Sequence, residues 1–111
     1  MKKFLILYHA PISAREMMAK ATPDQAKAGM NAWMAWAAKA GDAIVELGSP
    51  VGNSRNVNQT SVQGNDTSVV GYSVLQGNSQ EAVTELLKDH PHLRQPGFSI
   101  EVFQSLAMPG M

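Results

Sequence analysis

The chain has 111 residues, with nine basic residues, nine acidic residues and no cysteine. This length predicts one domain over residues 1–111 with a single hydrophobic core. A formal net charge of zero gives no basic field to attract nucleic acid, and the lack of cysteine excludes disulfides and thiolate chemistry.

The first predicted element is a strand over residues 3–9, built on the apolar run Phe4-Leu5-Ile6-Leu7-Tyr8. The preceding Met1-Lys2-Lys3 gives this end some likeness to an export signal, but the apolar run is too short for one. No stretch of the sequence has enough consecutive apolar residues to span a bilayer. We therefore expect a soluble cytoplasmic protein with no membrane partner.

The main predicted helix covers residues 23–40, after a connection over residues 11–21 that has helical character around residues 14–18. Thr22 and Gln25 form a capping box, and Gly41 is a natural stop. The predicted core stripe of this helix contains Ala26, Met30, Trp33, Met34 and Ala37. Trp36 is rotated away from that stripe, so we expect it at a pocket rim or a dimer contact.

The remaining elements complete the predicted order. A strand over residues 42–47 is followed by a polar stretch, residues 51–66, that holds a short strand near residues 56–62. An apolar central strand is predicted over residues 67–76. The second helix begins at a capping signature of Asn78 and Glu81 and ends near residues 88–89, because Pro91 disfavours helical geometry before it. The last strand covers residues 98–105.

This β-α-β-β-α-β order is typical of a ferredoxin-like α+β fold, with an antiparallel sheet and two helices on one face. Three of the predicted strands are apolar on both faces or nearly so, whereas a half-exposed antiparallel strand should alternate. The helices cover one face only. We therefore expect a homodimer in which the open sheet face of one copy covers that of another, as a dimeric α+β barrel.

Several local strings resemble the YCII-related family. They are, in chain order, residues 3–8, residues 30–36 with 40–42, Gly48-Ser49-Pro50, Gly71-Tyr72-Ser73, residues 78–82 and Asp89-His90-Pro91. The resemblance implies a ferredoxin-like dimeric α+β barrel, similar in fold to dimeric barrel monooxygenases and dehalogenase-like proteins.

Two signatures of that family differ in this chain. Some members carry a His-Asp pair proposed to be catalytic, and Met30 stands at the position of that histidine. Another branch carries an Asp-Gly-Pro-Phe string before its central strand, where this chain has Gly64-Asn65-Asp66-Thr67.

Histidines supply the candidate chemistry. Asp89, His90 and His92 surround Pro91 and form either a polar cluster for acid–base or metal chemistry or an ordinary helix C-terminus. Metal sites usually take three or four ligands, so we expect no metal. His9, at the end of the first strand, is suited to proton transfer near neutral pH. We take His9, Asp89 and His90 as the candidate catalytic residues.

The candidate ligand-binding residues are Trp36, Glu46 and His92. A carboxylate such as Glu46 would have a raised pKa if its strand faced an enclosed cavity. The sequence has no phosphate-binding loop, nucleophile elbow or His-Glu-x-x-His string, so we expect no cofactor.

These observations predict a homodimer that binds a small, partly apolar molecule, with cofactor-free acid–base or oxidative chemistry if the protein is an enzyme. The alternative is a non-enzymatic module for dimerisation or protein interaction. A buried polar cavity holding two or more of His9, Glu46, Asp89 and His90 would favour a ligand site. A cavity filled by Trp and Met side chains would favour a structural role.

Overall fold

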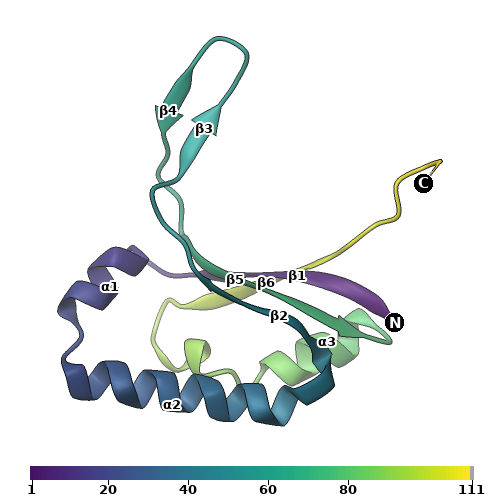
Figure 1. Ribbon diagram of the computed structural model, residues 1–111, viewed down its shortest axis with the longest axis horizontal. Coiled ribbons are helices and arrows are strands. Elements are labelled where there is room, and N and C mark those ends of the chain that lie inside the picture. The colour runs from purple at the N-terminus through teal and green to yellow at the C-terminus, as the bar shows by residue number, and fades with distance from the viewer. Residues whose placement is uncertain (111) are drawn as a thin grey trace.

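A four-stranded antiparallel sheet in the order β2-β5-β1-β6 forms the centre of the computed structural model, which describes residues 1–110 (Figure 1). Its strands are β1 (Lys2–His9), β2 (Ile44–Pro50), β5 (Val69–Gly77) and β6 (Ser99–Gln104). The short strands β3 (Arg55–Val57) and β4 (Val62–Gly64) pair only with each other, as a hairpin that projects from the sheet (Figure 1). This arrangement is compatible with the predicted ferredoxin-like α+β fold.

The helices lie on one side of the sheet (Figure 1). They are α1 (Ala14–Lys20), α2 (Pro23–Ala40) and α3 (Gln80–Leu87), with 3₁₀ turns η1 (Gly41–Ala43) and η2 (Pro91–Arg94). The predicted capping box is confirmed: the Gln25 backbone N–H donates to Thr22 Oγ1 at 3.1 Å, and the Thr22 backbone N–H donates to Gln25 Oε1 at 3.0 Å. Among the described residues, no helix is both long and apolar enough to cross a membrane.

Two local predictions were wrong in detail. The cap of α3 is Ser79, whose Oγ accepts from the Ala82 backbone N–H at 3.1 Å, one residue after the predicted Asn78. The polar stretch holds the β3–β4 hairpin instead of one strand, and its turn lies at residues 58–61, where Asn58 Oδ1 accepts from the backbone N–H groups of Thr60 and Ser61. An Asn side chain that satisfies two turn donors is a strong turn signal that the prediction overlooked.

The core lies between the helices and the inner face of the sheet, which we define as the face that carries Phe4, Ile6, Tyr8 and Leu75, all of them buried. Alternation along the strands places Leu5, Leu7, Val74 and Phe103 on the opposite, outer face. Leu5 is 41% exposed and Phe103 45% exposed, so no element of the chain fully covers this face.

The predicted core stripe of α2 was wrong by part of a turn. Met30 is 62% exposed, whereas Trp36 is only 4% exposed and its indole Nε1–H donates to the Leu86 carbonyl at 3.2 Å. The reason is the composition of this helix, which has alanine, methionine or tryptophan on nearly every side. Periodicity alone therefore defines no single stripe, and contact with α3 decides which side is buried.

A hydrogen-bonded serine ties three strands together beside the helices. Ser73 Oγ lies 2.6 Å from the Leu47 carbonyl and 2.7 Å from the Tyr8 hydroxyl. The register between β2 and β5 shifts on both sides of Glu46, which brings Leu47 over the inner face. This irregular part of β2 therefore forms one wall of the space between the sheet and the helices.

Candidate functional site

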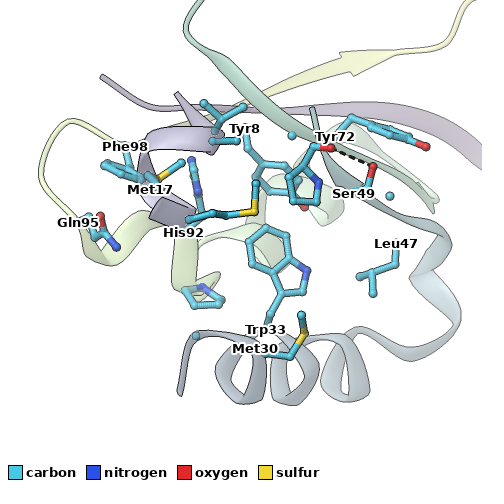
Figure 2. Close-up of a pocket in the computed structure, with 18 residues that line it drawn as sticks. Tyr8, Met17, Met30, Trp33, Leu47, Ser49, Tyr72, His92, Gln95 and Phe98 are labelled. Atoms are coloured by element: carbon cyan, nitrogen blue, oxygen red, sulfur yellow. Dashed lines mark hydrogen bonds between the residues drawn. The ribbon is translucent and has the colours of Figure 1, made fainter. Parts of the chain in front are cut away.

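A cavity of about 380 Å³ lies between the inner face of the sheet and the segments α1, α2 and η2 (Figure 2). Small-molecule sites commonly have volumes of about 300–1,000 Å³ and mainly apolar walls. The walls of this cavity are mainly apolar, and its lining includes Met17, Met30, Trp33, Leu47, Pro91 and Phe98. The size and the lining are those of a small-molecule site.

Aromatic rings form the middle of the cavity. Trp33 rises from α2 toward Tyr8 of β1 (Figure 2), and the two rings meet edge to face with centroids 5.0 Å apart. His92 lies 5.2 Å from the Tyr8 ring and 5.0 Å from the Phe98 ring, measured between centroids. Rings that pack on one another are restricted in their motion, so this part of the wall is preformed.

Methionine side chains form the more adaptable part of the wall. Met17 and Met18 come from α1 and Met30 from α2, and all three line the cavity. Methionine has an unbranched, polarizable side chain that adjusts to the shape of what it contacts. The cavity therefore combines a fixed aromatic centre with a rim of adaptable methionine side chains.

The Tyr8 hydroxyl is occupied within the protein. Ser73 has one hydroxyl hydrogen, which goes to the Leu47 carbonyl, so the Tyr8 hydroxyl donates to Ser73 Oγ. Burial raises the pKa of Tyr8, which keeps the phenol protonated. Tyr8 therefore presents its ring to the cavity as an apolar surface.

His92 and Gln95 bring polar atoms to one end of the cavity (Figure 2). His92 Nε2 lies 2.9 Å from the backbone carbonyl of His9, and because a carbonyl only accepts, the proton sits on Nε2. Burial lowers the pKa of His92 below its ordinary value of 6.5. The ring is therefore neutral at pH 7, and the cavity contains no fixed charge from this histidine.

His90 lies behind the cavity wall and is 1% exposed. Its Nδ1 accepts from the His92 backbone N–H at 3.0 Å, so the proton of the neutral ring is on Nε2. Among residues 1–110, no oxygen or nitrogen partners this Nε2. The centroid of the His90 ring lies 4.3 Å from that of Trp33 and 4.5 Å from that of Trp36. The indole faces are therefore the available acceptors for the His90 Nε2–H.

The structure does not bring the predicted catalytic residues together. His9 is on the outer face, where it contacts Ser68 and Glu101. Asp89 forms an exposed ion pair with Lys39, and this hydrogen bond lowers the pKa of the Asp89 carboxyl. His90 is buried among the two tryptophans, so the three side chains have three separate environments.

The predicted ligand-binding residues are also divided. His92 lines the cavity. Glu46 lies on the outer face, where its carboxylate accepts from the Tyr72 hydroxyl at 2.5 Å, and Trp36 is buried against α3. Trp33 takes the cavity position that was expected of Trp36, and Tyr8, Phe98 and Gln95 were missed. Tyr8 alone had a usable signal, as an aromatic residue at the end of a strand, beside His9.

The cavity meets neither of the two predicted outcomes in full. None of His9, Glu46, Asp89 and His90 lines it, so this cavity does not meet the condition stated for a polar ligand site. Tryptophan and methionine side chains form the wall, yet they leave about 380 Å³ unfilled. The geometry therefore favours an apolar ligand over a charged one.

Within residues 1–110, no group of three or more His, Asp or Glu side chains is placed to hold a metal ion. The ring centroids of His90 and His92 are 6.5 Å apart, and Asp89 is held by Lys39. No protein-family model matches the chain, and no curated protein matches it.

Proposed function

We propose that the protein binds a small, largely apolar molecule with a flat ring, and that the ring lies beside Trp33 in the cavity. The unfilled volume of about 380 Å³ against an aromatic and methionine wall is the observation that carries this proposal. Transfer of apolar surface from water contributes about 25 cal/mol per Å² to binding. His92 and Gln95 supply hydrogen-bonding partners for one polar group at the end of the ligand.

A thermal-shift screen of small aromatic alcohols and acids tests this proposal. A ligand present at about 100 times its Kd stabilises the folded state by roughly 2.7 kcal/mol, which for a domain of this size raises the Tm by about 10 °C or more. We expect the same rise in Met34→Trp and none in Met30→Trp. Met30 lines the cavity, whereas Met34 is an exposed residue one turn further along α2 that does not.

Two results of the screen would count against a ligand site. One is a set of compounds that leaves the Tm of the unmodified protein unchanged. The other is an equal rise in Tm for Met30→Trp and Met34→Trp. A ligand that still binds when the introduced tryptophan fills the cavity in Met30→Trp must bind elsewhere.

We further propose that the protein is a homodimer, joined through the outer face of the sheet as in a dimeric α+β barrel. Leu5 lies between Val74 and Phe103 in the register of the adjacent strands β5, β1 and β6, so these apolar side chains form one continuous row. The carboxylates on this face, Glu46 and Glu101, are hydrogen bonded within their own chain. With a formal net charge of zero, two copies carry no overall charge repulsion.

Two projecting segments support a second copy as the occupant. The β3–β4 hairpin and the tail after β6 extend away from the helices, on the side of the outer face (Figure 1). Val57 and Val62 pair across the hairpin, and both are exposed, as are Leu106 and Met108 in the tail. The radius of gyration is 15.6 Å, against about 13 Å for a compact domain of this length. An isolated hairpin is marginally stable, so we expect these arms to pack on the partner.

Replacing Leu5 with lysine tests the dimer. A lysine in the middle of the buried row would be desolvated without a partner, so we expect the dimer Kd to rise by roughly 100-fold or more. Light scattering during size-exclusion chromatography should give twice the chain mass of 11.9 kDa for the unmodified protein and the chain mass for Leu5→Lys. Met34→Lys, on the helical side, should remain dimeric. An unmodified protein that elutes as a monomer at micromolar concentration contradicts the proposal.

A further inference from the structure

Three polar side chains form a hydrogen-bonded chain where β1 ends on the outer face. His9 Nδ1 lies 2.7 Å from Ser68 Oγ, and His9 Nε2 lies 2.7 Å from Glu101 Oε1. The register of β1 and β6 places Glu101 on the same face as His9, two residues from the residue opposite His9. The Ala10 backbone N–H donates to the Ser68 carbonyl at 2.9 Å, which fixes Ser68 beside the histidine.

The positions of the protons in this group of three hydrogen-bonded side chains follow from which atoms can only accept. An ionised carboxylate only accepts hydrogen bonds, so His9 Nε2 carries the proton that is donated to Glu101. In the neutral ring His9 Nδ1 is then an acceptor, and the Ser68 hydroxyl donates to it. Ser68 is thus aligned to lose its proton to His9, while Glu101 holds the ring in place.

The site opens to solvent at the end of the sheet, and it is separate from the apolar cavity. A shallow depression holds all three side chains and is bordered by Ala10 and Pro11 after β1 and by Gly97 before β6. Tyr8 faces the cavity on the inner face, so β1 itself separates the two sites. Ala10, Gly97 and Ser99 are small, so the lining of the depression favours a short acyl group over a bulky one.

We propose that Ser68 is a nucleophile that takes small acyl groups from activated carboxylic esters, with His9 as its general base and Glu101 as a positioning residue. This site is separate from the cavity, so it does not depend on the ligand proposed there. It lies on the outer face four residues along β1 from Leu5, at the end of the sheet and beyond the apolar row proposed to join the dimer.

The reaction balances with water as the second reactant. Ser68 Oγ bonds to the carbonyl carbon of the ester, and its proton passes to His9 Nδ1. The bond from that carbon to the leaving oxygen breaks, and the leaving alkoxide takes the proton from His9. Water then attacks the acyl-Ser68 ester through the same base, releasing the carboxylic acid and restoring the Ser68 hydroxyl.

Covalent labelling with a small alkyl fluorophosphonate tests the assignment, because the reagent bonds to an activated serine oxygen and releases fluoride. Peptide mass spectrometry should place the adduct on Ser68 in the unmodified protein. Ser68→Ala should lose the label, whereas Ser105→Ala, at an exposed serine outside the depression, should keep it. General-base assistance typically contributes about 10²–10⁴-fold in rate, so His9→Gln should label at least about 100-fold more slowly.

The role of Glu101 requires a separate measurement. Glu101→Gln keeps an oxygen acceptor but removes the charge, and we expect labelling to slow by at least about tenfold with the Tm unchanged. Glu101→Asp, which restores the carboxylate, should recover part of the rate. The proposal is overturned if the unmodified protein carries no adduct on Ser68, or if His9→Gln labels at the same rate as the unmodified protein.

Discussion

Replacing Gly48 with alanine should lower the free energy of unfolding by at least about 3 kcal/mol, the largest effect we expect from a single methyl group in this chain. Gly48 has a φ of +81°, which side-chain-bearing residues rarely adopt, and a Cβ there would lie 1.7 Å from the backbone carbonyl oxygen of Tyr72. A backbone atom cannot move aside by changing rotamer. Part of β2 must therefore separate from β5, and the cavity wall at Leu47 would move with it.

Thermal unfolding followed by circular dichroism measures this effect, with an expected fall in Tm of about 12 °C or more for a domain of this size. Gly52→Ala is the matched control. It lies four residues further along the chain, just after β2, it has no strained φ, and its Cβ would meet nothing within 4 Å. We expect Gly52→Ala to change the free energy of unfolding by less than about 0.5 kcal/mol. A similar loss of unfolding free energy in Gly48→Ala and Gly52→Ala would contradict the close approach of β2 and β5.

The stability of the protein should fall as the pH is lowered from about 6.5 to about 4, because of His90. Burial, followed by the nearby charges of His92 and Arg94, lowers the pKa of His90 to about 4 from its ordinary value of 6.5. Between these values the unfolded chain holds a proton on His90 that the folded protein does not. The free energy of unfolding therefore loses up to about 3 kcal/mol across this window, and the contribution is complete above pH 6.5.

Denaturant unfolding at several pH values between 7.5 and 4 measures this loss, with His90→Asn as the comparison. Asparagine does not titrate, and its side-chain oxygen is suited to accept from the His92 backbone N–H, as His90 Nδ1 does now. The variant should be less stable at pH 7.5, because it packs less well against the tryptophans, and its stability should depend less steeply on pH. Equal pH dependence in the two proteins would mean that His90 is not the buried group responsible.

The features predicted correctly from the sequence are those set by neighbours along the chain. The start of α2 at Thr22, with its reciprocal bonds to Gln25, depends on four consecutive residues. The end of α2 at Gly41, which has a φ of +55°, is equally local. The run Phe4 to Tyr8 identified β1, since an apolar stretch of that length and composition is typical of a central strand.

The features that were missed depend on contacts between distant parts of the chain. Trp33 and Trp36 are the same residue type on the same helix, so the sequence does not distinguish them. Only the packing of α3 against one side of α2 determines that Trp33 lines the cavity and Trp36 lies in the core. The contacts of His9 with Ser68 and Glu101 span 59 and 92 residues. They depend on strand register, including the irregularity between Tyr8 and His9, which periodicity cannot supply.

The two indole N–H signals of the protein offer the most direct test of the cavity as a binding site. Trp33 lines the cavity, whereas the Trp36 Nε1–H is tied to the Leu86 carbonyl and faces away from it. In a titration with indole followed by ¹H–¹⁵N NMR, with the signals assigned through Trp33→Phe, we expect a saturable shift of the Trp33 signal and little change in that of Trp36. Equal, linear, non-saturating shifts of both signals, or no shift of the Trp33 signal at all, would contradict a ligand bound in this cavity.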